Sequence, residues 1–444
     1  MDWTVREAAL QCVGFRAGGA RLDMEVRIIV AQPETGFSAV GRNRKVAIIT
    51  LPGNFNYGNK LQLYACVRIW ERLGFEPEFL SAGWYDRRPS PMRNLVRKVL
   101  LGREPVVHPE ELSSPERLKS FARFNLLIPE RRVEVPSRSL ADSYCLFSVG
   151  SDQVWNVSSL WPMSEGSGLI EQYRCLRRHL AEKRFLDWWF LRMCRPEQRV
   201  AMAASIGADE VSIRGAMLLR RGVAGFHRLS VREERGVQIL REVTGREAEL
   251  LCDPTIVLTV DEWRSVADNR YTPATPYVLT YLLGGNSKEA QTVLDCVTRG
   301  GMIPTVAISD RMRPGELPVG PAEFLSLIDH AMHVVTDSYH ASVFAMHMRV
   351  PLTITHRVGS GSAGSMFSRL ESLAQTYGLE NKIYGSTYFD LARAGDYPDV
   401  DAVMESEREK FEGYLLSCMK DAGLDEMVDT YCPMGGLCKS ESQA

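Results

Sequence analysis

The sequence contains no run of about 18 or more consecutive apolar residues, the length that a transmembrane helix requires. Its first 44 residues also lack the continuous apolar segment that characterises a secretory signal. We therefore expect neither a membrane-spanning nor a secreted protein, and the cytoplasm is the expected compartment.

An excess of one charge is absent as well. The 53 Lys and Arg residues are balanced by 55 Asp and Glu residues, which gives a formal net charge of -2. Bulk charge therefore favours neither a nucleic-acid nor a polyphosphate partner, and any site for an anion must be built locally.

Metal-binding cysteine spacing is lacking too. The 10 cysteines are scattered, and several lie in apolar runs such as YACVRI and CLFSV, where cysteine usually acts as a small buried side chain. The one close pair, Cys432 and Cys438, has no histidine nearby and lacks zinc-finger spacing. We expect no metal ion.

What the chain does contain is a regular alternation of strands and helices. At 444 residues with 45% hydrophobic content, it exceeds what a single core usually serves. Short apolar strands alternate with helical patterns from residue 45 onward, which predicts an α/β fold with parallel sheets covered by helices on both faces. The predicted strands are 46–50, 145–149, 201–205, 229–231, 277–282, 306–309, 333–336 and 352–355.

Two α/β domains follow from this pattern, because the polar segment 268–276 carries two prolines and separates the strands into two groups. The predicted parts are an N-terminal extension (1–44), a first domain (45–268), a second domain (269–390), a C-terminal helix that packs back across the domains (391–424) and a loose tail (425–444).

A helical insertion is predicted in the first domain, near residues 160–198. Within it, the segment 172–195 combines seven basic residues with leucines and aromatic side chains. A basic, aromatic, amphipathic helix can lie on an anionic membrane surface. The alternative is a helical hairpin whose aromatic face packs on the body of the protein.

Polar residues collect directly after the predicted strands, at the edge where ligands bind in doubly wound sheets. We therefore predict a cleft between two facing sheets that binds a small anion. Its candidate residues are Asn56, Gly58, Asn59, Gln62, Gly150, Ser151, Asp152, Arg232, Ser338, His340, Gly359, Ser360 and Gly361.

Each candidate also has a purely structural interpretation. Asn56 and Asp152 are typical helix caps, and His340 suits a buried core position. The segment GSGSAG (359–364) matches the dinucleotide pattern GxGxxG, but no acidic residue follows at the expected distance of about 20 residues. A loop that binds a single phosphate or carboxylate through its amides is the better interpretation. His340, if it lies in the first turn of a helix, would be placed for acid–base chemistry or phosphate binding.

Seven segments together resemble the polysaccharide pyruvyl transferase family, in order and over residues 45–424. They are GNFNYGNKLQLYA (53–65), FSVGSDQVWN (147–156), AASIG (203–207), LSVREERG (229–236), LCDPTIVLTVDEW (251–263), GPAEFLSLIDHAMHVVTDSYHASVFA (320–345) and SRLESLAQTYGL (368–379).

The resemblance implies two Rossmann-like domains facing across a cleft, similar to glycosyltransferases of the B architecture (GT-B). It also implies a ketal-forming transferase that moves a pyruvyl group from phosphoenolpyruvate to a saccharide acceptor, in the biosynthesis of exopolysaccharide or another cell-surface glycan. Phosphoenolpyruvate is then a donor substrate, and no cofactor is expected. A lipid-linked acceptor would place the protein peripherally at the inner membrane face, with 172–195 as the contact.

The implied roles fall on a few residues. His340 is the first choice for the general acid–base and Asp152 the second. Arg232 and the helix N-termini after DSYH and GSGSAG would bind the donor's anionic groups, and Asn59 and Gln62 would hold the acceptor or the donor carboxylate.

Two positions depart from the family pattern. Some members carry an arginine two residues before the histidine, where this chain has Ser338, and many have glycine where it has Ala341. One phosphate contact must therefore come from elsewhere.

Two other functions remain open. One is a glycosyltransferase with a nucleotide-sugar donor, with Glu316 and Glu323 as candidates for binding the ribose. The other is a glycan- or anion-binding protein that has kept the fold without the chemistry.

Overall fold

A computed structural model describes residues 43–53, 55–83, 113–157, 181–310, 312–313, 315–357 and 363–429. The described residues belong to one compact unit that begins at Asn43. Nearly all of the expected N-terminal extension, residues 158–180 of the expected insertion and the tail from residue 430 lie outside the described residues.

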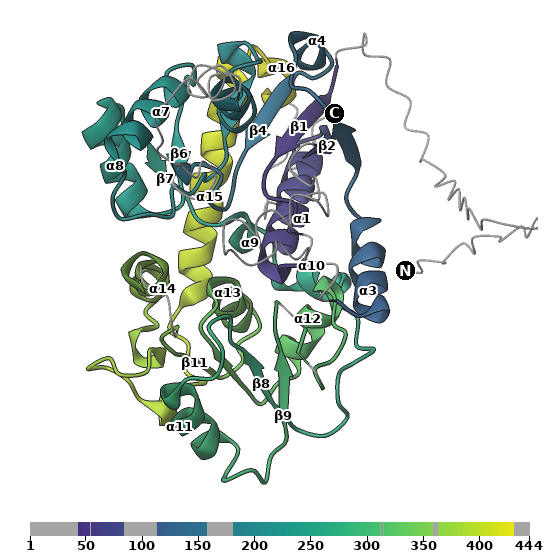
Figure 1. The fold of residues 1–444 in the computed structure, drawn as a ribbon, viewed down its shortest axis with the longest axis vertical. Coiled ribbons are helices and arrows are strands. Elements are labelled where there is room, and N and C mark those ends of the chain that lie inside the picture. Colours follow the sequence, from purple (N-terminus) through teal and green to yellow (C-terminus); the bar gives the residue numbers. More distant parts are fainter. Residues whose placement is uncertain are drawn as a thin grey trace, which may run out of the picture. The chain divides into compact units, whose positions relative to one another are not determined.

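The first sheet has five strands in the order β3-β2-β1-β4-β5, and all neighbours are parallel (Figure 1). They are β1 (Lys45–Ile49), β2 (Glu76–Ala82), β3 (Glu130–Val133), β4 (Leu146–Val149) and β5 (Arg199–Ala201). A short parallel pair, β6 (Ser230–Val231) and β7 (Glu249–Leu250), follows and is linked by a bridge between Ala204 and Val231. Strands β1 and β4 are almost wholly buried, as their β-branched and apolar side chains predict.

The second sheet has four parallel strands in the order β11-β10-β8-β9. They are β8 (Val278–Tyr281), β9 (Thr305–Ile308), β10 (His333–Thr336) and β11 (Leu352–Ile354). All eight predicted strands overlap observed ones, and the prediction of an α/β fold with parallel sheets is confirmed.

Helices connect the strands and cover the sheets. The longer helices are α1 (Tyr57–Arg72), α3 (Pro115–Asn125), α7 (Ile213–Val223), α8 (Glu234–Thr244), α11 (Lys288–Val297), α12 (Pro321–Asp329), α13 (Tyr339–His347), α14 (Ala363–Tyr377) and α15 (Val400–Asp421). The short ones are α4 (Arg138–Ala141), α9 (Pro254–Val257), α10 (Val260–Ser265), α16 (Asp425–Asp429) and the 3₁₀ turns Pro196–Gln198, Glu380–Lys382 and Leu391–Arg393. None of the described helices is both long enough and apolar enough to cross a membrane.

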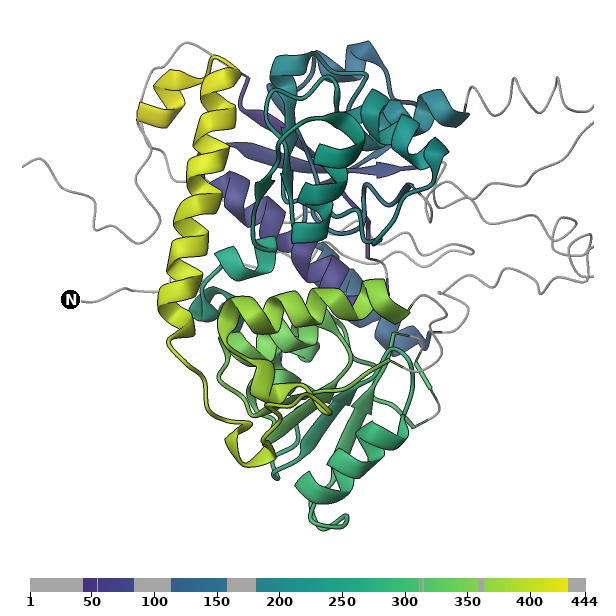
Figure 2. The same cartoon turned by 90° about the vertical axis from the view of Figure 1, so that its left-hand side faces the viewer.

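Helix α1 packs against elements of both sheets, so the two share one hydrophobic core. Tyr57 of α1 stacks on Phe324 of α12 with 4.7 Å between ring centroids, and its hydroxyl donates to the Ser309 carbonyl at 3.3 Å. Helix α15 runs past both sheets (Figure 2), and its Asp421 pairs with Arg228 of the first half at 2.7 Å. The predicted domain boundary between residues 268 and 269 therefore lies within one continuous core, and the division into two domains stays a prediction.

The described part of the basic aromatic segment packs into the protein. Residues 181–189 are helical, and Phe185, Trp188, Trp189 and Phe190 are buried in the core of the first sheet. Trp155 stacks on Phe190 with 5.4 Å between ring centroids and donates from Nε1 to the Trp189 carbonyl at 3.0 Å. These four aromatic side chains thus follow the second interpretation, in which the aromatic face packs on the body of the protein. Membrane contact through 172–180 lies outside the described residues.

Candidate active site

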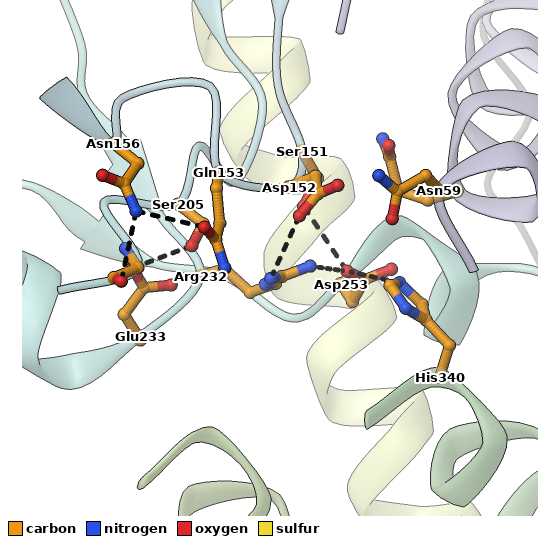
Figure 3. A network of polar contacts seen from close by, with 12 residues as sticks. Asn59, Ser151, Asp152, Gln153, Asn156, Ser205, Arg232, Glu233, Asp253 and His340 are labelled. Carbon is orange, nitrogen blue, oxygen red and sulfur yellow. Dashed lines mark hydrogen bonds and ion pairs between the residues drawn. The ribbon is translucent and has the colours of Figure 1, made fainter. Parts of the chain in front are cut away.

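An ion pair between two buried side chains lies at the centre of the site (Figure 3). Arg232 follows β6 and Asp253 follows β7, and because parallel strands end at the same edge, the two side chains meet. Arg232 Nη1 donates to Asp253 Oδ2 at 2.5 Å, and the side chains are 2% and 0% exposed. Asp253 also caps α9 by accepting from the backbone N–H and the hydroxyl of Thr255.

Each charge stabilises the other. Burial alone would raise the pKa of Asp253, but Arg232 and His340 outweigh burial and hold that pKa well below its usual range. Burial alone would lower the pKa of Arg232, but Asp253 and Tyr339 outweigh it and raise that pKa. Both groups therefore stay charged at neutral pH.

The guanidinium of Arg232 keeps donors free for a ligand. Its Nε and Nη2 atoms are buried and make no hydrogen bond to any described residue. A buried donor without a partner costs about 1–3 kcal/mol, so a ligand or a water molecule that accepts from these atoms would be favoured. Its guanidinium carbon also lies 5.1 Å from the centroid of the Tyr339 ring. Both residues line a pocket of about 280 Å³ between β6, β7 and α14.

His340 lies in the first turn of α13, in agreement with the sequence prediction. Ser338 is the N-cap residue, and its hydroxyl accepts from the Ala341 N–H at 3.5 Å. The His340 Nε2 atom lies 3.7 Å from Asp253 Oδ2, and the side chain is 11% exposed. His340 is therefore at the rim of the site and next to a permanent negative charge, which suits an imidazole that holds and releases a proton.

Gly58 allows α1 to approach this histidine closely. A Cβ atom at residue 58 would lie 2.1 Å from His340 Nδ1, far inside van der Waals contact. The sequence predicts Gly58 as a binding residue. In the structure Gly58 instead contacts His340 and sets the position of its imidazole.

The loop after β4 supplies Asp152. Its Oδ1 atom lies 3.9 Å from Arg232 Nη2, and its buried Oδ2 atom makes no hydrogen bond to the described part of the chain. Asp152 has φ 64°, and the preceding Gly150 is at φ 123°, where a side chain would collide with the Met202 carbonyl. The hydroxyl of Ser151 donates to Asp253 Oδ2 at 3.4 Å. This loop therefore brings a second carboxylate to the same guanidinium.

The residues of α1 divide into two groups. The Asn56 side chain caps the helix by accepting from the Asn59 N–H at 3.1 Å, which matches its structural interpretation. The Asn59 side chain points toward the side of the site where Asp253 and His340 lie (Figure 3). Gln62 is wholly buried and bonded to Thr50 and Cys66, so its amide does not reach the site. Of these three, Asn59 is placed to contact a substrate.

The remaining predicted binding residues cannot be placed. Gly359, Ser360 and Gly361 lie outside the described residues.

Two residues of the site were not predicted from the sequence. Asp253 has a recognisable signal, since an aspartate followed by proline after a strand is typical of a capped helix start. Glu233 follows Arg232 directly, and its Oε1 accepts from the N–H groups of Ile206 and Gly207 at 2.7 and 2.9 Å. It thereby fastens the AASIG loop beside the site.

The carboxylates considered for nucleotide binding are engaged within the protein. Glu323 accepts from Arg123 at 2.7 Å and from the Gly320 N–H at 3.0 Å. Glu316 accepts from the Ser309 hydroxyl at 2.6 Å and the Arg313 N–H at 2.8 Å. Within the described ranges, no group of three or more His, Cys, Asp or Glu side chains has an arrangement that could hold a metal ion.

Comparison with known families decides the relationship. A sequence model of the family "Polysaccharide pyruvyl transferase" matches residues 56–354, more than half of the chain. The chain belongs to the polysaccharide pyruvyl transferase family. This membership makes it a transferase that acts on polysaccharides, and all site residues described above lie within the matched range.

The solved structures to which this polysaccharide pyruvyl transferase family member is similar share little sequence identity with it. Arabidopsis thaliana UGT89C1, complexed with UDP-L-rhamnose, is 12% identical with a TM-score of 0.37 over 88% of this chain and 100% of that one. SnogD, a glycosyltransferase from Streptomyces nogalater, is 13% identical with a TM-score of 0.33 over 86% and 99%. A putative UDP-N-acetylglucosamine 2-epimerase from Listeria monocytogenes is 12% identical with a TM-score of 0.35 over 87% and 98%. No curated protein matches the chain significantly.

Proposed function

We propose that the protein transfers the pyruvyl group of phosphoenolpyruvate to two hydroxyls of a saccharide acceptor and thereby forms a cyclic ketal. The observation that carries the proposal is the buried Arg232–Asp253 pair beside His340, which joins free guanidinium donors to an imidazole at one position. An anionic donor that must be protonated during the reaction requires both.

The reaction balances in atoms and in charge. A proton is added to the methylene carbon of phosphoenolpyruvate, which leaves the neighbouring carbon electrophilic. Two acceptor hydroxyls form C–O bonds to that carbon, the C–O bond to phosphate breaks, and the two hydroxyl protons replace the proton on carbon and protonate the leaving phosphate. The products are a saccharide with a pyruvate ketal and inorganic phosphate.

We assign His340 as the acid that adds the proton to the methylene carbon. Asp253, which stays ionised, lies 3.7 Å from the His340 Nε2 atom and positions the imidazole. Asp152 is the second candidate, and its free Oδ2 is suited to accept a proton from an acceptor hydroxyl. Arg232 holds the donor through Nε and Nη2, and Asn59 orients the acceptor.

Thermal denaturation with added ligand tests the donor. Phosphoenolpyruvate should raise the Tm, because a ligand that binds only the folded state stabilises it in proportion to the logarithm of its concentration. UDP-glucose and GDP-mannose are the comparison ligands. Stabilisation by a nucleotide sugar, with no effect of phosphoenolpyruvate, would refute the proposal.

A further inference from the structure

Arg232 alone cannot balance the proposed donor. Phosphoenolpyruvate carries a phosphate and a carboxylate, whereas Arg232 already faces Asp253 and Asp152. The position two residues before His340 holds Ser338, whose hydroxyl caps α13. A donor with two anionic groups therefore gains from a further cation, and the N-terminus of α13 is a place where one can act beside His340.

Arg357 lies at this helix N-terminus. It follows β11, and its Nη2 donates to the Asp337 carbonyl at 3.2 Å, while its Nε lies 3.4 Å from Asp337 Oδ2. Asp337 directly precedes Ser338, the N-cap residue of α13. The guanidinium of Arg357 is therefore held next to the residue that cannot itself supply a charge.

The sheet places Arg357 and His340 at one edge. Strands β10 and β11 are parallel neighbours with Thr336 opposite Ile354, so the residues that follow them leave the sheet side by side. The same edge faces α1, because Ser309, which follows β9, accepts from Tyr57. Helix α1 in turn brings Gly58 against His340. Arg357 thus borders the site that contains His340.

One side of the guanidinium is fixed and the other is open. The Asp337 carboxylate accepts from the N–H groups of Leu283 and Gly284 at 2.7 and 2.8 Å, which fixes the group that anchors Arg357. The Nη1 atom of Arg357 has no hydrogen-bond partner among the described residues, and the side chain is 22% exposed. A planar guanidinium anchored along one edge is suited to bind phosphate through its other edge.

We propose that Arg357 binds the phosphate group of the donor over the N-terminus of α13, beside His340. Arg232 then binds the carboxylate from the opposite side. This assignment rests on the proposed function, and it names a cation next to Ser338, whose own side chain is uncharged.

Isothermal titration with phosphoenolpyruvate tests the assignment on the full chain. Arg357→Gln should weaken binding by roughly tenfold to a hundredfold, the effect of losing a hydrogen bond between charged groups. Inorganic phosphate should compete with the donor in the wild type, and its affinity should fall in the variant by a similar factor. The matched control is Arg349→Gln, at the opposite end of α13, which should bind both ligands like the wild type.

The outcomes are distinguishable. Failure of the wild-type protein to bind phosphoenolpyruvate would overturn the proposed function and this inference together. Equal affinity of the wild type and Arg357→Gln would overturn the inference alone, as would a loss of donor affinity with phosphate affinity unchanged. If Arg357→Gln lowers the Tm, Arg357→Lys is the second variant, because it keeps the charge beside Asp337 but loses the planar pair of N–H donors. It should bind the donor about threefold or more weakly, and unchanged affinity would overturn the assignment.

Discussion

Replacement of Gly58 by alanine should displace His340 while leaving the protein folded. The new Cβ atom would lie 2.1 Å from His340 Nδ1, whereas atoms in favourable contact are about 3.5–4.0 Å apart. The imidazole must therefore move by roughly 1 Å or more, or α1 must shift by that amount. Either movement separates His340 from the position that Asp253 and Arg232 define.

The loss of rate should exceed the loss of stability. A displacement of about 1 Å at a catalytic group can cost about 100-fold in rate, which corresponds to about 2.7 kcal/mol of activation free energy. Overpacking costs about 1–3 kcal/mol of folding free energy, and alanine returns about 1 kcal/mol of it through its higher helix propensity. The net change in unfolding free energy should thus be about 0–2 kcal/mol.

The assay measures kcat for phosphate release from phosphoenolpyruvate with a saturating acceptor, together with the Tm. The control is Gly413→Ala in α15, where the methyl group of alanine would meet no atom within 4 Å. It should keep the wild-type kcat and gain up to about 1 kcal/mol of stability. A folded Gly58→Ala protein with wild-type kcat would refute the reasoning that Gly58 positions His340.

Three other predictions concern the buried charges and thiols. Asp253→Asn leaves Arg232 buried without its partner and should lower the unfolding free energy by about 3–5 kcal/mol in urea denaturation, whereas Asp261→Asn, on an exposed side chain, should change it little. The pKa of Asp253 is lower in the folded state than in the unfolded state, so its ionised form stabilises the fold fully above about pH 4, the unfolded pKa. This stabilisation is lost progressively as the pH falls below that value. An unfolding free energy that does not fall between about pH 5 and pH 3 would contradict this. Burial raises the pKa of Cys66 to about 12, so iodoacetamide at about pH 8 should label the exposed Cys296 and leave Cys66 unlabelled until the protein unfolds.

The sequence predicts the strands where burial leaves a clear pattern. Strands β1, β4, β8 and β10 consist mostly of apolar or β-branched residues, and the predicted ranges match each of them within a residue or two. Strand β3 has the sequence ERRV and three exposed residues, so its place in the sheet comes from tertiary packing rather than from hydrophobic pattern.

The site is partly predictable for the same reason. Residues that follow parallel strands leave a sheet at its carboxyl edge, and the sequence groups Arg232 with His340 because it predicts that two such edges face each other across a cleft. Gln62 is a candidate by its residue type, yet its position on α1 turns it into the core, and only the packing of α1 reveals this. The Asp–Pro pair identifies Asp253 as a helix cap, but no local pattern specifies its contact with His340 or the contact of Arg357 with Asp337, because these residues are far apart in the chain.

Product analysis by mass spectrometry tests the central claim most directly. The protein is incubated in D₂O with phosphoenolpyruvate, UDP-glucose, GDP-mannose and a panel of free and lipid-linked oligosaccharides. We predict a glycan that gains one pyruvate ketal with a single deuterium in its methyl group, because the proton added to carbon comes from His340 in exchange with solvent, and His340→Gln should abolish this product. A glycan that gains a sugar from an added nucleotide sugar, with phosphoenolpyruvate unconsumed, would contradict the account.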